Sequence, residues 1–212
     1  MKSKKYLRIV SQLVFLTLFL FLLYIGNLQL WIVVFIIGVA ASIGLGRLYC
    51  GWICPMDTLA RPINWLKDKL SIGALDVPDI FRSKKLRYSI VLIFFGSLVM
   101  LKFLGVQLPF PNVLIITVIG VTFLTVFDEE LFHKYLCPYG AILSLSSKPS
   151  RYIMKVDKEG CIGCGRCQEV CPPDTIETLD SGKREVTNKE CLKCFQCQDV
   201  CPADCITYEK KD

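Results

Sequence analysis

Long apolar runs separated by short polar segments dominate the first two thirds of the chain. The runs extend over about Leu7–Ile25, Leu28–Leu45, Ser89–Val106 and Val113–Phe127. A helix needs about 20 apolar residues to cross a hydrocarbon layer about 30 Å thick, so each run predicts a membrane-spanning helix. The fourth run is short, and its helix would have to stand upright or thin the bilayer. The pattern therefore predicts an all-α membrane domain over residues 1–150, built as a four-helix bundle.

The last third of the chain has a different pattern, in which apolar and polar residues alternate over short stretches. Two such stretches flank Asp180–Gly182, which is a strong signal for a β-hairpin. A second pair of strands is expected between Tyr152–Val156 and Ile206–Glu209. Residues 151–212 are therefore predicted to form a small α+β domain.

The composition and the placement of charge agree with a membrane protein. Of the 212 residues, 53% are hydrophobic, whereas soluble domains are about 45–50% apolar. Three lysines precede the first run and Arg8 lies at its start, and eight basic residues lie between the second and third runs, while the other two connections carry no charge. Because Lys and Arg are in excess on cytoplasmic loops, both termini and the central loop are predicted to lie in the cytoplasm.

The net charge of +6 is unevenly divided along the chain. Residues 1–150 carry 15 basic and 7 acidic side chains, and residues 151–212 carry 10 and 12. The basic excess therefore follows the topology and faces anionic lipid, and it gives no support for nucleic-acid binding. The basic start also fits a signal peptide, but the apolar run is longer than the usual stretch of about 7–15 residues, so it is expected to be retained as an anchor.

Cysteine supplies the candidate chemistry. CIGCGRCQEVCP at residues 161–172 recurs as CLKCFQCQDVCP at residues 191–202, and both have the spacing C-x2-C-x2-C-x3-C-P. This spacing is typical of bacterial ferredoxins with two 4Fe-4S clusters, in which the fourth cysteine of each run binds the other cluster. The first cluster is therefore expected on Cys161, Cys164, Cys167 and Cys201, and the second on Cys191, Cys194, Cys197 and Cys171.

Two other uses of these cysteines are less favoured. Zinc sites close with ligands in two separated pairs, whereas four cysteines crowd into each run here. Disulfides need an oxidising compartment, whereas the predicted topology places every cysteine motif in the cytoplasm. Cys205 is matched by Thr175 in the first run, so we expect it to be a buried free thiol rather than a ligand.

The membrane half contains an internal repeat with a shift of 83 residues, which predicts two helical hairpins of the same design. The shift aligns Cys54 with Cys137 and Cys50 with His133. Side chains four apart lie on one face of a helix, so these four are predicted to converge on the cytoplasmic side. Three thiolates and an imidazole suit a third iron–sulfur cluster. The alternatives are a zinc site, or cysteines that are simply small buried hydrophobes.

RLYCGWICP and its echo KYLCPYGA, followed by a two-cluster ferredoxin, resemble the membrane-bound polyferredoxins of the NapH and NosR type over nearly the whole chain. The motif of that family, C-x-x-x-C-P twice, carries over to Cys50, Cys54, Pro55, Cys137 and Pro138. The chain departs from the motif with His133 in place of the first cysteine of the second copy, and with Asp57 where a glycine is usual. The resemblance therefore leaves the identity of the membrane-side centre open.

The resemblance implies quinol oxidation, or an electron relay between quinone, cytoplasmic carriers and membrane partners. We therefore expect an electron-transfer subunit of a quinol dehydrogenase type of oxidoreductase in the cytoplasmic (inner) membrane, with no catalytic residue of its own. Its expected partners are the lipid bilayer, a cytoplasmic donor or acceptor, quinone, and a flavin- or haem-bearing membrane subunit. The second hypothesis is a redox sensor or an assembly factor for a membrane redox enzyme.

Four residues near the end of the second run have a mixed aromatic and basic character. Arg47, Tyr49, Trp52 and Trp65 could line a headgroup pocket for quinone, but such residues more often form a belt at the membrane interface. We therefore expect them in an interfacial belt. The runs themselves carry almost no ionisable residue, which argues against an ion pump or a channel.

Overall fold

The computed structural model describes residues 2–70, 87–89, 91–93, 96, 100, 103 and 131–211. The fourth predicted span lies outside these residues, and so does most of the third. Of the four-helix bundle expected over residues 1–150, the structure therefore describes the first hairpin and the segment that follows the fourth span.

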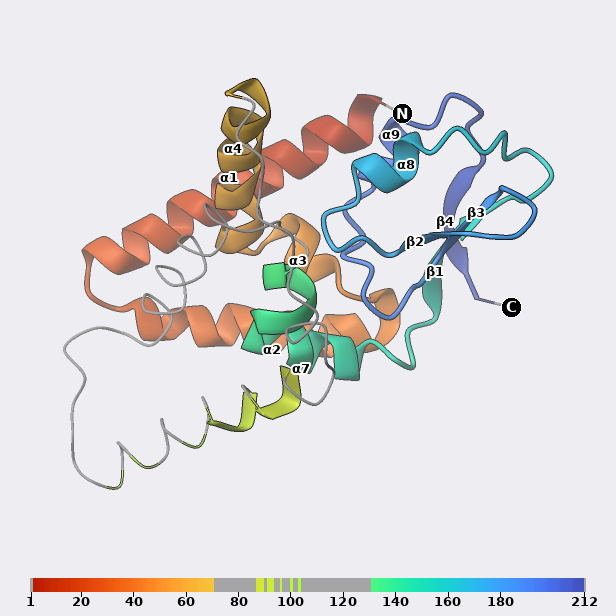
Figure 1. The fold of residues 1–212 in the computed structure, drawn as a ribbon. Helices are drawn as coiled ribbons and strands as arrows, with labels where there is room; N and C mark the ends of the chain where they lie inside the picture. Colours follow the sequence, from red (N-terminus) through yellow and green to blue (C-terminus); the bar gives the residue numbers. More distant parts are fainter. Residues whose placement is uncertain are drawn as a thin grey trace.

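A helical hairpin forms the amino-terminal part of the molecule (Figure 1). Helices α1 (Lys2–Tyr24) and α2 (Trp31–Leu45) are joined through a short 3-10 helix, η1 (Leu28–Leu30). The stretches Lys4–Tyr24 and Leu28–Leu45 are each long and apolar enough to cross a membrane. These are the first two runs that the hydrophobic pattern predicts, and they indicate that the protein associates with a membrane.

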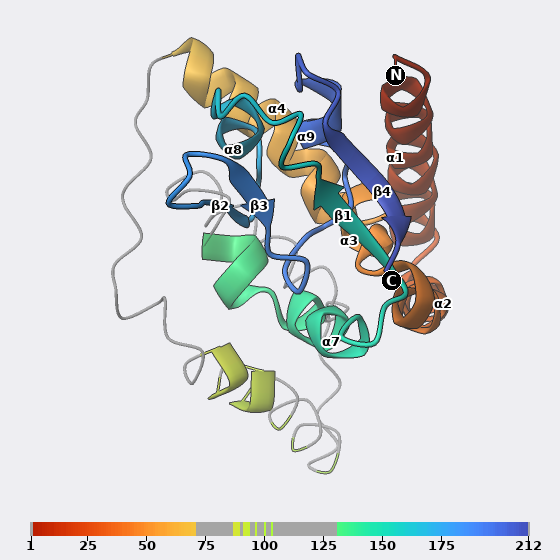
Figure 2. The ribbon, with the colours of Figure 1, turned by 90° about the vertical axis from the view of Figure 1, so that its right-hand side faces the viewer.

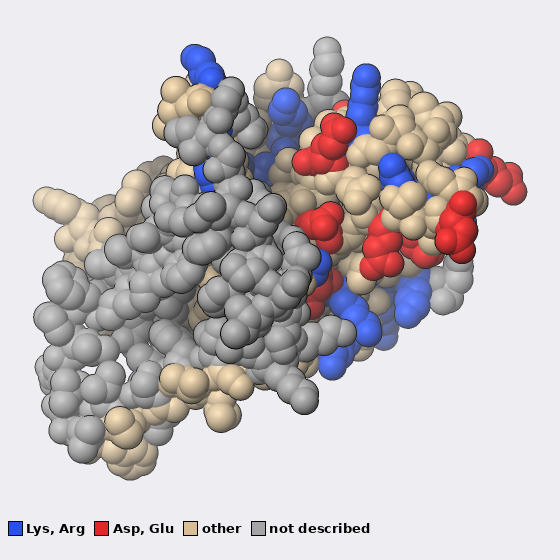
Figure 3. Space-filling view, in the orientation of Figure 1, with Lys and Arg blue, Asp and Glu red and all other residues tan. Residues whose placement is uncertain are grey.

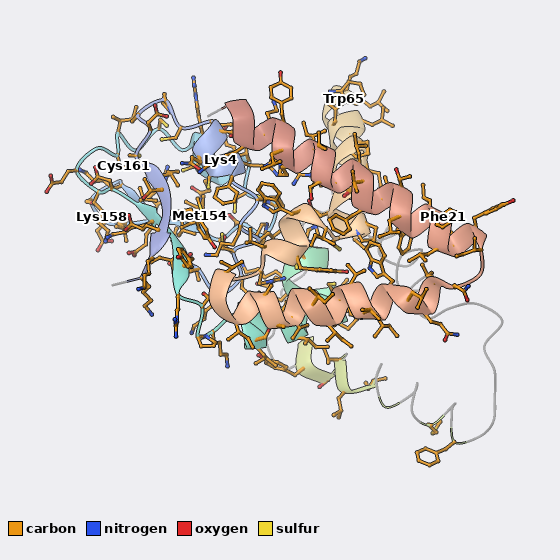
Figure 4. All side chains as sticks on the ribbon, turned by 180° about the vertical axis from the view of Figure 1, so that it is seen from behind. Lys4, Phe21, Trp65, Met154, Lys158 and Cys161 are labelled. Carbon is orange, nitrogen blue, oxygen red and sulfur yellow. The ribbon has the colours of Figure 1, made fainter. Side chains whose placement is uncertain are left out.

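The two faces of α1 lie in different environments. Apolar side chains such as Phe21 are exposed on the outer face (Figure 4), as expected for a surface that lipid covers. The buried residues Arg8, Gln12, Phe19 and Leu22 are four, seven and three apart, the spacing of one helix face. Because its first two members are polar, the apolar part of this face begins only after Gln12.

Two further helices follow the hairpin and carry the first copy of the cysteine motif. Gly46 ends α2 with a φ of 80°, a left-handed conformation that favours glycine. The chain then turns into α3 (Leu48–Trp52) and, directly after Cys54, into α4 (Pro55–Lys69). Proline suits the first position of a helix because no N–H is needed there.

The second copy of the motif is built in the same way. A π-helix, η3 (Leu131–Leu136), leads to Cys137, and α7 (Pro138–Ser146) begins at the next residue. The sulfur of Cys137 accepts a hydrogen bond from the backbone N–H of Gly140 at 3.3 Å and so caps this helix. Each copy of the repeat therefore ends in a cysteine that precedes a new helix.

The carboxy-terminal part begins with a strand that pairs with the end of the chain. β1 (Tyr152–Val156) and β4 (Ile206–Lys210) are antiparallel, with Tyr152 opposite Lys210 and Val156 opposite Ile206. The sequence prediction of this strand pair is confirmed.

A second two-stranded sheet lies between the two cysteine runs. β2 (Ile176–Thr178) and β3 (Arg184–Val186) are antiparallel and form the hairpin predicted around Asp180–Gly182. One short helix contains the third cysteine of each C-x2-C-x2-C run, α8 (Arg166–Glu169) in the first repeat and α9 (Gln196–Asp199) in the second. In both sheets a strand of one repeat pairs with a strand of the other, so the two repeats interlock.

The carboxy-terminal part packs against one end of the helical hairpin (Figure 2). The backbone N–H of Arg151 donates to the carbonyl of Gly44 at 2.9 Å, and the hydroxyl of Tyr208 donates to the carbonyl of Leu45 at 2.7 Å. α9 contacts the beginning of α1. The otherwise open end of α2 is thus satisfied by groups from the carboxy-terminal part.

The predicted interfacial belt is wrong for three of its four residues. Arg47 and Tyr49 are only 1% and 5% exposed. Trp52 packs edge to face on Phe195 with ring centroids 5.9 Å apart, and only Trp65, on α4, is exposed (Figure 4). Aromatic and basic side chains can bind lipid headgroups, but they can equally well hydrogen-bond polar groups inside the protein. Composition alone therefore could not distinguish a membrane interface from a buried position.

The surface of the carboxy-terminal part carries both signs of charge. Figure 3 shows acidic and basic side chains interspersed over this part of the molecule. Some are paired, such as Lys155 with Glu209 at 2.8 Å and Lys158 with Glu185 at 3.3 Å. The surface therefore resembles that of a soluble domain, in contrast to the apolar outer face of α1.

Candidate functional site

Two small pockets in the carboxy-terminal part contain the cysteines of the two runs. The first pocket is lined by Cys161, Cys164, Cys167, Cys201 and Cys205. The second is lined by Cys171, Cys191, Cys194 and Cys197. In each pocket the fourth cysteine of one run joins the first three of the other, which is the grouping that the ferredoxin spacing predicts. Ligation of iron by these groups stays a prediction.

The backbone has the same unusual shape around both pockets. Gly163 and Gly165 have φ of 71° and 82°, and the matching residues of the second run, Lys193 and Phe195, have φ of 53° and 61°. Left-handed residues turn successive backbone N–H groups toward one side, which makes a concave site for an anion. A left-handed conformation costs a non-glycine residue about 1–2 kcal/mol, so the second loop keeps its shape against its local preference.

Backbone and hydroxyl donors point at the sulfur atoms. Burial alone raises the pKa of Cys161, but hydrogen bonds from the N–H groups of Gly163 and Arg184 outweigh it and lower the pKa below its usual value. In the second pocket, the N–H and the hydroxyl of Thr175 both lie 3.4 Å from the sulfur of Cys171. These donors stabilise thiolate, the form that binds metal.

The donor set of the second pocket fits an iron–sulfur cluster. Burial, followed by the charge of Asp57, raises the pKa of Cys194 to about 12, and burial also raises the pKa of Cys197. Crowded buried thiols of this kind ionise only when a metal supplies positive charge. Four thiols, apolar walls and inward N–H donors therefore meet the requirements of a 4Fe-4S cluster.

The two pockets differ in their distance from solvent. Cys164 of the first pocket is exposed, and its neighbour Ile162 is 68% exposed. Cys194 of the second pocket is buried, and the adjacent Lys193 is only 1% exposed. Figure 4 shows Cys161 and Phe21, at the far end of α1, on opposite sides of the molecule. The first pocket therefore opens to solvent and the second lies between the two parts of the protein.

The four residues predicted for the membrane-side centre lie in one region. Cys50, Cys137 and His133 are buried, and Cys54 is half-buried between them in contact with the same apolar clusters. Burial, with the charges of Cys50 and Cys137, holds the pKa of the Cys54 thiol well above its usual value. Burial also lowers the pKa of His133 to about 4, so its imidazole is neutral near pH 7, as a metal ligand requires.

Within the ranges that the structure describes, no three His, Cys, Asp or Glu side chains converge as ligands of one ion. A 4Fe-4S cluster takes each thiolate on a different iron, so its ligands need not converge in that way. A cluster at the membrane-side group therefore stays a prediction.

Arg47 joins the membrane-side region to the second pocket. Its guanidinium lies 3.8 Å from the sulfur of Cys50, 3.5 Å from the carbonyl oxygen of His133 and 2.6 Å from a carboxylate oxygen of Glu190. Glu190 directly precedes Cys191. A single buried cation thus contacts the membrane-side group and the residue that precedes the second cysteine run.

α1 also contributes polar contacts that the sequence analysis missed. Arg8 donates to the carbonyl of Cys194, and Gln12 donates to the carbonyl of Gly51 at 3.0 Å and to the carboxylate of Asp57 at 2.8 Å. The signal was present in the sequence, because Arg8 and Gln12 are spaced four apart on a strongly apolar helix. Polar residues placed in this way indicate a buried polar partner.

Comparison with known families agrees with these sites. Residues 153–202 match the family described as a 4Fe-4S dicluster domain. Residues 27–73 and 110–156 both match a family described as a 4Fe-4S binding domain. The second of these two matches begins 83 residues after the first, which confirms the internal repeat. No solved structure matches the chain.

Several curated proteins are similar to this chain. The ferredoxin-type protein MauN of Methylobacillus flagellatus, named for methylamine utilization, is 30% identical over 60% of this chain and 48% of its own length. The uncharacterized protein MJ0749 of Methanocaldococcus jannaschii is 29% identical over 65% and 56%. The regulatory protein NosR of Pseudomonas aeruginosa is 28% identical over 62% and 21%.

The chain thus spans about half the length of MJ0749 and MauN, and a smaller part of NosR. The similarity extends over both the membrane half with its repeat and the dicluster domain. On these matches, the chain belongs to the membrane-associated, ferredoxin-type 4Fe-4S electron transport proteins of the NapH and NosR type.

Proposed function

We propose that this protein is a membrane-anchored electron relay. Residues 1–150 form a four-span domain whose two cysteine motifs hold a membrane-side centre, and residues 151–212 form a domain with two 4Fe-4S clusters. Both termini and all three centres face the cytoplasm. Electrons pass between a cytoplasmic redox partner and either quinone or a membrane partner subunit.

The observation that carries this proposal is the direct packing of the second cysteine loop on the first membrane-side motif. Cys50 and Tyr49 share one apolar cluster with Leu192 and Cys194. A Cβ atom built on Gly51 would lie 2.7 Å from the carbonyl oxygen of Leu192, so glycine is what permits this approach. Two predicted redox centres are therefore in contact through protein atoms, with no solvent layer between them.

The order of the centres follows from their exposure. The pocket with Cys161 and Cys164 opens to solvent, where a soluble partner can approach it. The pocket with Cys194 lies against the region of Cys50 and Cys54. Under this proposal the path runs between solvent and membrane through the first pocket, the second pocket and the membrane-side centre, in either direction.

The family matches support the choice of ligands for the membrane-side centre. Both matches to the 4Fe-4S binding family contain one copy of the motif, with Cys50 and Cys54 in the first and His133 and Cys137 in the second. When bound there, a cluster would supply one-electron chemistry next to the lipid. The chain's own contribution is to hold these four side chains together, to exclude water, and to place Arg47 beside Cys50.

The names of the relatives favour two candidate functions. MauN is named as a ferredoxin-type protein, which supports the relay. NosR is named as a regulatory protein, which supports redox regulation or assembly of a partner enzyme as the second candidate. The two differ in turnover, because a relay passes electrons continuously and a sensor changes state once per signal.

Cluster reduction by quinol tests the relay. The full chain is purified without oxygen, placed in liposomes, and supplied with menaquinol and a soluble electron acceptor. We expect sustained acceptor reduction that is lost in Cys50→Ser and in Cys137→Ser, and that is kept in the control Lys189→Met, which changes an exposed side chain. Iron analysis of the first two variants shows whether the loss accompanies a missing centre. No reduction with any quinol would limit the relay to protein partners, and single-turnover behaviour would favour the sensor.

A further inference from the structure

The two cysteine loops differ at one position that lies beside the second pocket. The 30-residue offset between the runs places Lys193 at the position of Gly163. The backbone is left-handed at both, with φ of 53° and 71°. Glycine adopts this conformation without cost, whereas lysine does so at a cost and is here only 1% exposed. A strained and buried lysine needs a favourable interaction to hold it in place.

The surroundings of Lys193 are arranged to accept a cation. Its ammonium donates to the side-chain oxygen of Asn188 at 2.5 Å. The same oxygen accepts from the N–H of Met154 at 2.8 Å, while the amide nitrogen of Asn188 donates to the Met154 carbonyl. The amide is therefore fixed with its oxygen toward the ammonium. A Cβ atom on Gly46 would lie 2.7 Å from the Lys193 side chain, so Gly46 provides the space for it.

Three acidic residues near the second pocket have arginine partners. Glu190 pairs with Arg47 and Arg87, Asp57 with Arg61, and Asp199 with Arg8. Lys193 makes no ion pair with any carboxylate in the described ranges. Lys193 lies between Cys191 and Cys194 in the second loop, and the Asn188 side chain that holds its ammonium also bonds Met154 and Val186, which line the second pocket. The ammonium is therefore placed beside this pocket, where ligated thiolates would supply the negative charge that no carboxylate in the described part of the chain supplies.

A second difference between the repeats also favours an added electron at the second pocket. In the second pocket the hydroxyl of Thr175 lies 3.4 Å from the sulfur of Cys171. In the first pocket the matching residue is Cys205, whose sulfur lies 3.4 Å from that of Cys201. A thiol is a weaker hydrogen-bond donor than a hydroxyl. Hydrogen bonds to the cysteine sulfurs and nearby charge both help to set the reduction potential. The Thr175 hydroxyl favours an added electron at the second pocket. The first pocket has a cation of its own in Arg184, but that side chain is only half-buried, whereas Lys193 is almost fully buried.

We propose that Lys193 is the internal counter-cation of the second cluster and makes it the higher-potential cluster of the two. This inference rests on the relay described above and gives a direction to the electron transfer between its two 4Fe-4S clusters. One electron leaves the reduced first cluster, which is oxidised, and reduces the second, with no bond formed or broken and no proton moved. Burial of the second cluster opposes its reduction, but the same low dielectric strengthens the attraction to Lys193. An electron that enters at the exposed pocket therefore comes to rest beside Cys50.

A redox titration of the full chain, followed by electron paramagnetic resonance, tests this assignment. Lys193→Met removes the charge and keeps the length, Lys193→Arg keeps the charge, and Lys189→Met removes an exposed charge from the same segment as a control. We expect Lys193→Met to lower the reduction equilibrium constant of the higher-potential cluster at least tenfold, which is about 59 mV for one electron. Lys193→Arg and Lys189→Met should change it less than threefold.

Iron content and thermal unfolding are measured on every variant. If Lys193→Met fails to load iron, the two single variants Thr175→Val and Cys205→Ala are titrated instead. We expect Thr175→Val to shift the higher-potential step and Cys205→Ala to shift the lower-potential step. A fully loaded Lys193→Met protein with an unchanged higher-potential step, or with a shift of the lower one only, would overturn the assignment. Absence of clusters from the wild-type protein would instead refute the relay itself.

Discussion

The guanidinium of Arg47 lies 2.6 Å from the carboxylate of Glu190, across 143 residues of sequence. Arg47 is three residues before Cys50, and Glu190 is one residue before Cys191. The other carboxylate oxygen of Glu190 accepts a hydrogen bond from Arg87 at 2.8 Å. Since Arg47 is almost fully buried, this ion pair fixes the dicluster domain against the membrane-side motif.

Loss of the Glu190 charge should therefore weaken the packing between the two parts of the protein. Breaking a buried ion pair by changing one partner costs about 3–5 kcal/mol, and Glu190→Gln leaves two arginines without their carboxylate. We expect a clear decrease in the thermal unfolding temperature in detergent, measured by circular dichroism. The matched control is Glu185→Gln, which breaks the exposed pair with Lys158 and should cost about 1 kcal/mol or less. Equal effects of the two variants would contradict the role of Glu190.

Gly51 should not tolerate a side chain. In Gly51→Ala the new Cβ atom would meet the Leu192 carbonyl at 2.7 Å and the Cys194 side chain at 3.0 Å. Overpacking of this kind costs about 1–3 kcal/mol, and it should also slow electron transfer between the second pocket and the membrane side. Gly44→Ala is the control, because a Cβ atom there meets nothing within 4 Å. Rapid single-turnover reduction in Gly51→Ala at the rate of the control would argue against direct packing as the path.

Gln12 should contribute more to the free energy of unfolding than expected for a residue of a membrane helix. Gln12→Leu removes the donor to the Gly51 carbonyl and to the Asp57 carboxylate, which stay buried. A buried acceptor that loses its donor costs about 1–3 kcal/mol. Thr17→Val on the exposed face of α1 is the control, since its hydroxyl bonds only within the helix, and it should stay within about 0.5 kcal/mol. Unfolding free energies of the two variants check the comparison.

The exchange of the fourth cysteines can be tested by counting iron. Cys171 belongs to the first run but lines the second pocket. The double variant Cys171→Ala with Cys191→Ala should therefore lose one cluster, or about four irons, whereas Cys171→Ala with Cys161→Ala should lose both. Cys205→Ala should keep the full iron content. The reverse pattern in the two double variants would show that each run binds its own cluster.

The local structure of both halves could be predicted because local patterns determine it. The first two apolar runs became α1 and α2, and the alternating stretches around Asp180–Gly182 became the β2–β3 hairpin. The strict spacing of the cysteines also predicted which of them share a pocket. Each of these signals is contained within a few tens of residues.

The docking of the two halves could not be predicted, because it depends on contacts between distant parts of the sequence. Nothing near Trp52 in sequence shows that its ring N–H donates to the Lys193 carbonyl at 2.9 Å. The same holds for Arg8, which was counted as a topological charge and instead donates to the carbonyl of Cys194. These side chains satisfy buried polar groups whose positions follow only from the assembled fold.

The central claim is that the carboxy-terminal domain holds two iron–sulfur clusters in contact with the membrane-side motif. The most direct measurement is iron and acid-labile sulfide per chain in oxygen-free protein, together with electron paramagnetic resonance after reduction by dithionite. We predict a brown protein with about eight irons or more and the broadened signal of clusters that interact. A colourless protein, with no iron and no paramagnetic signal after reduction, would contradict the account.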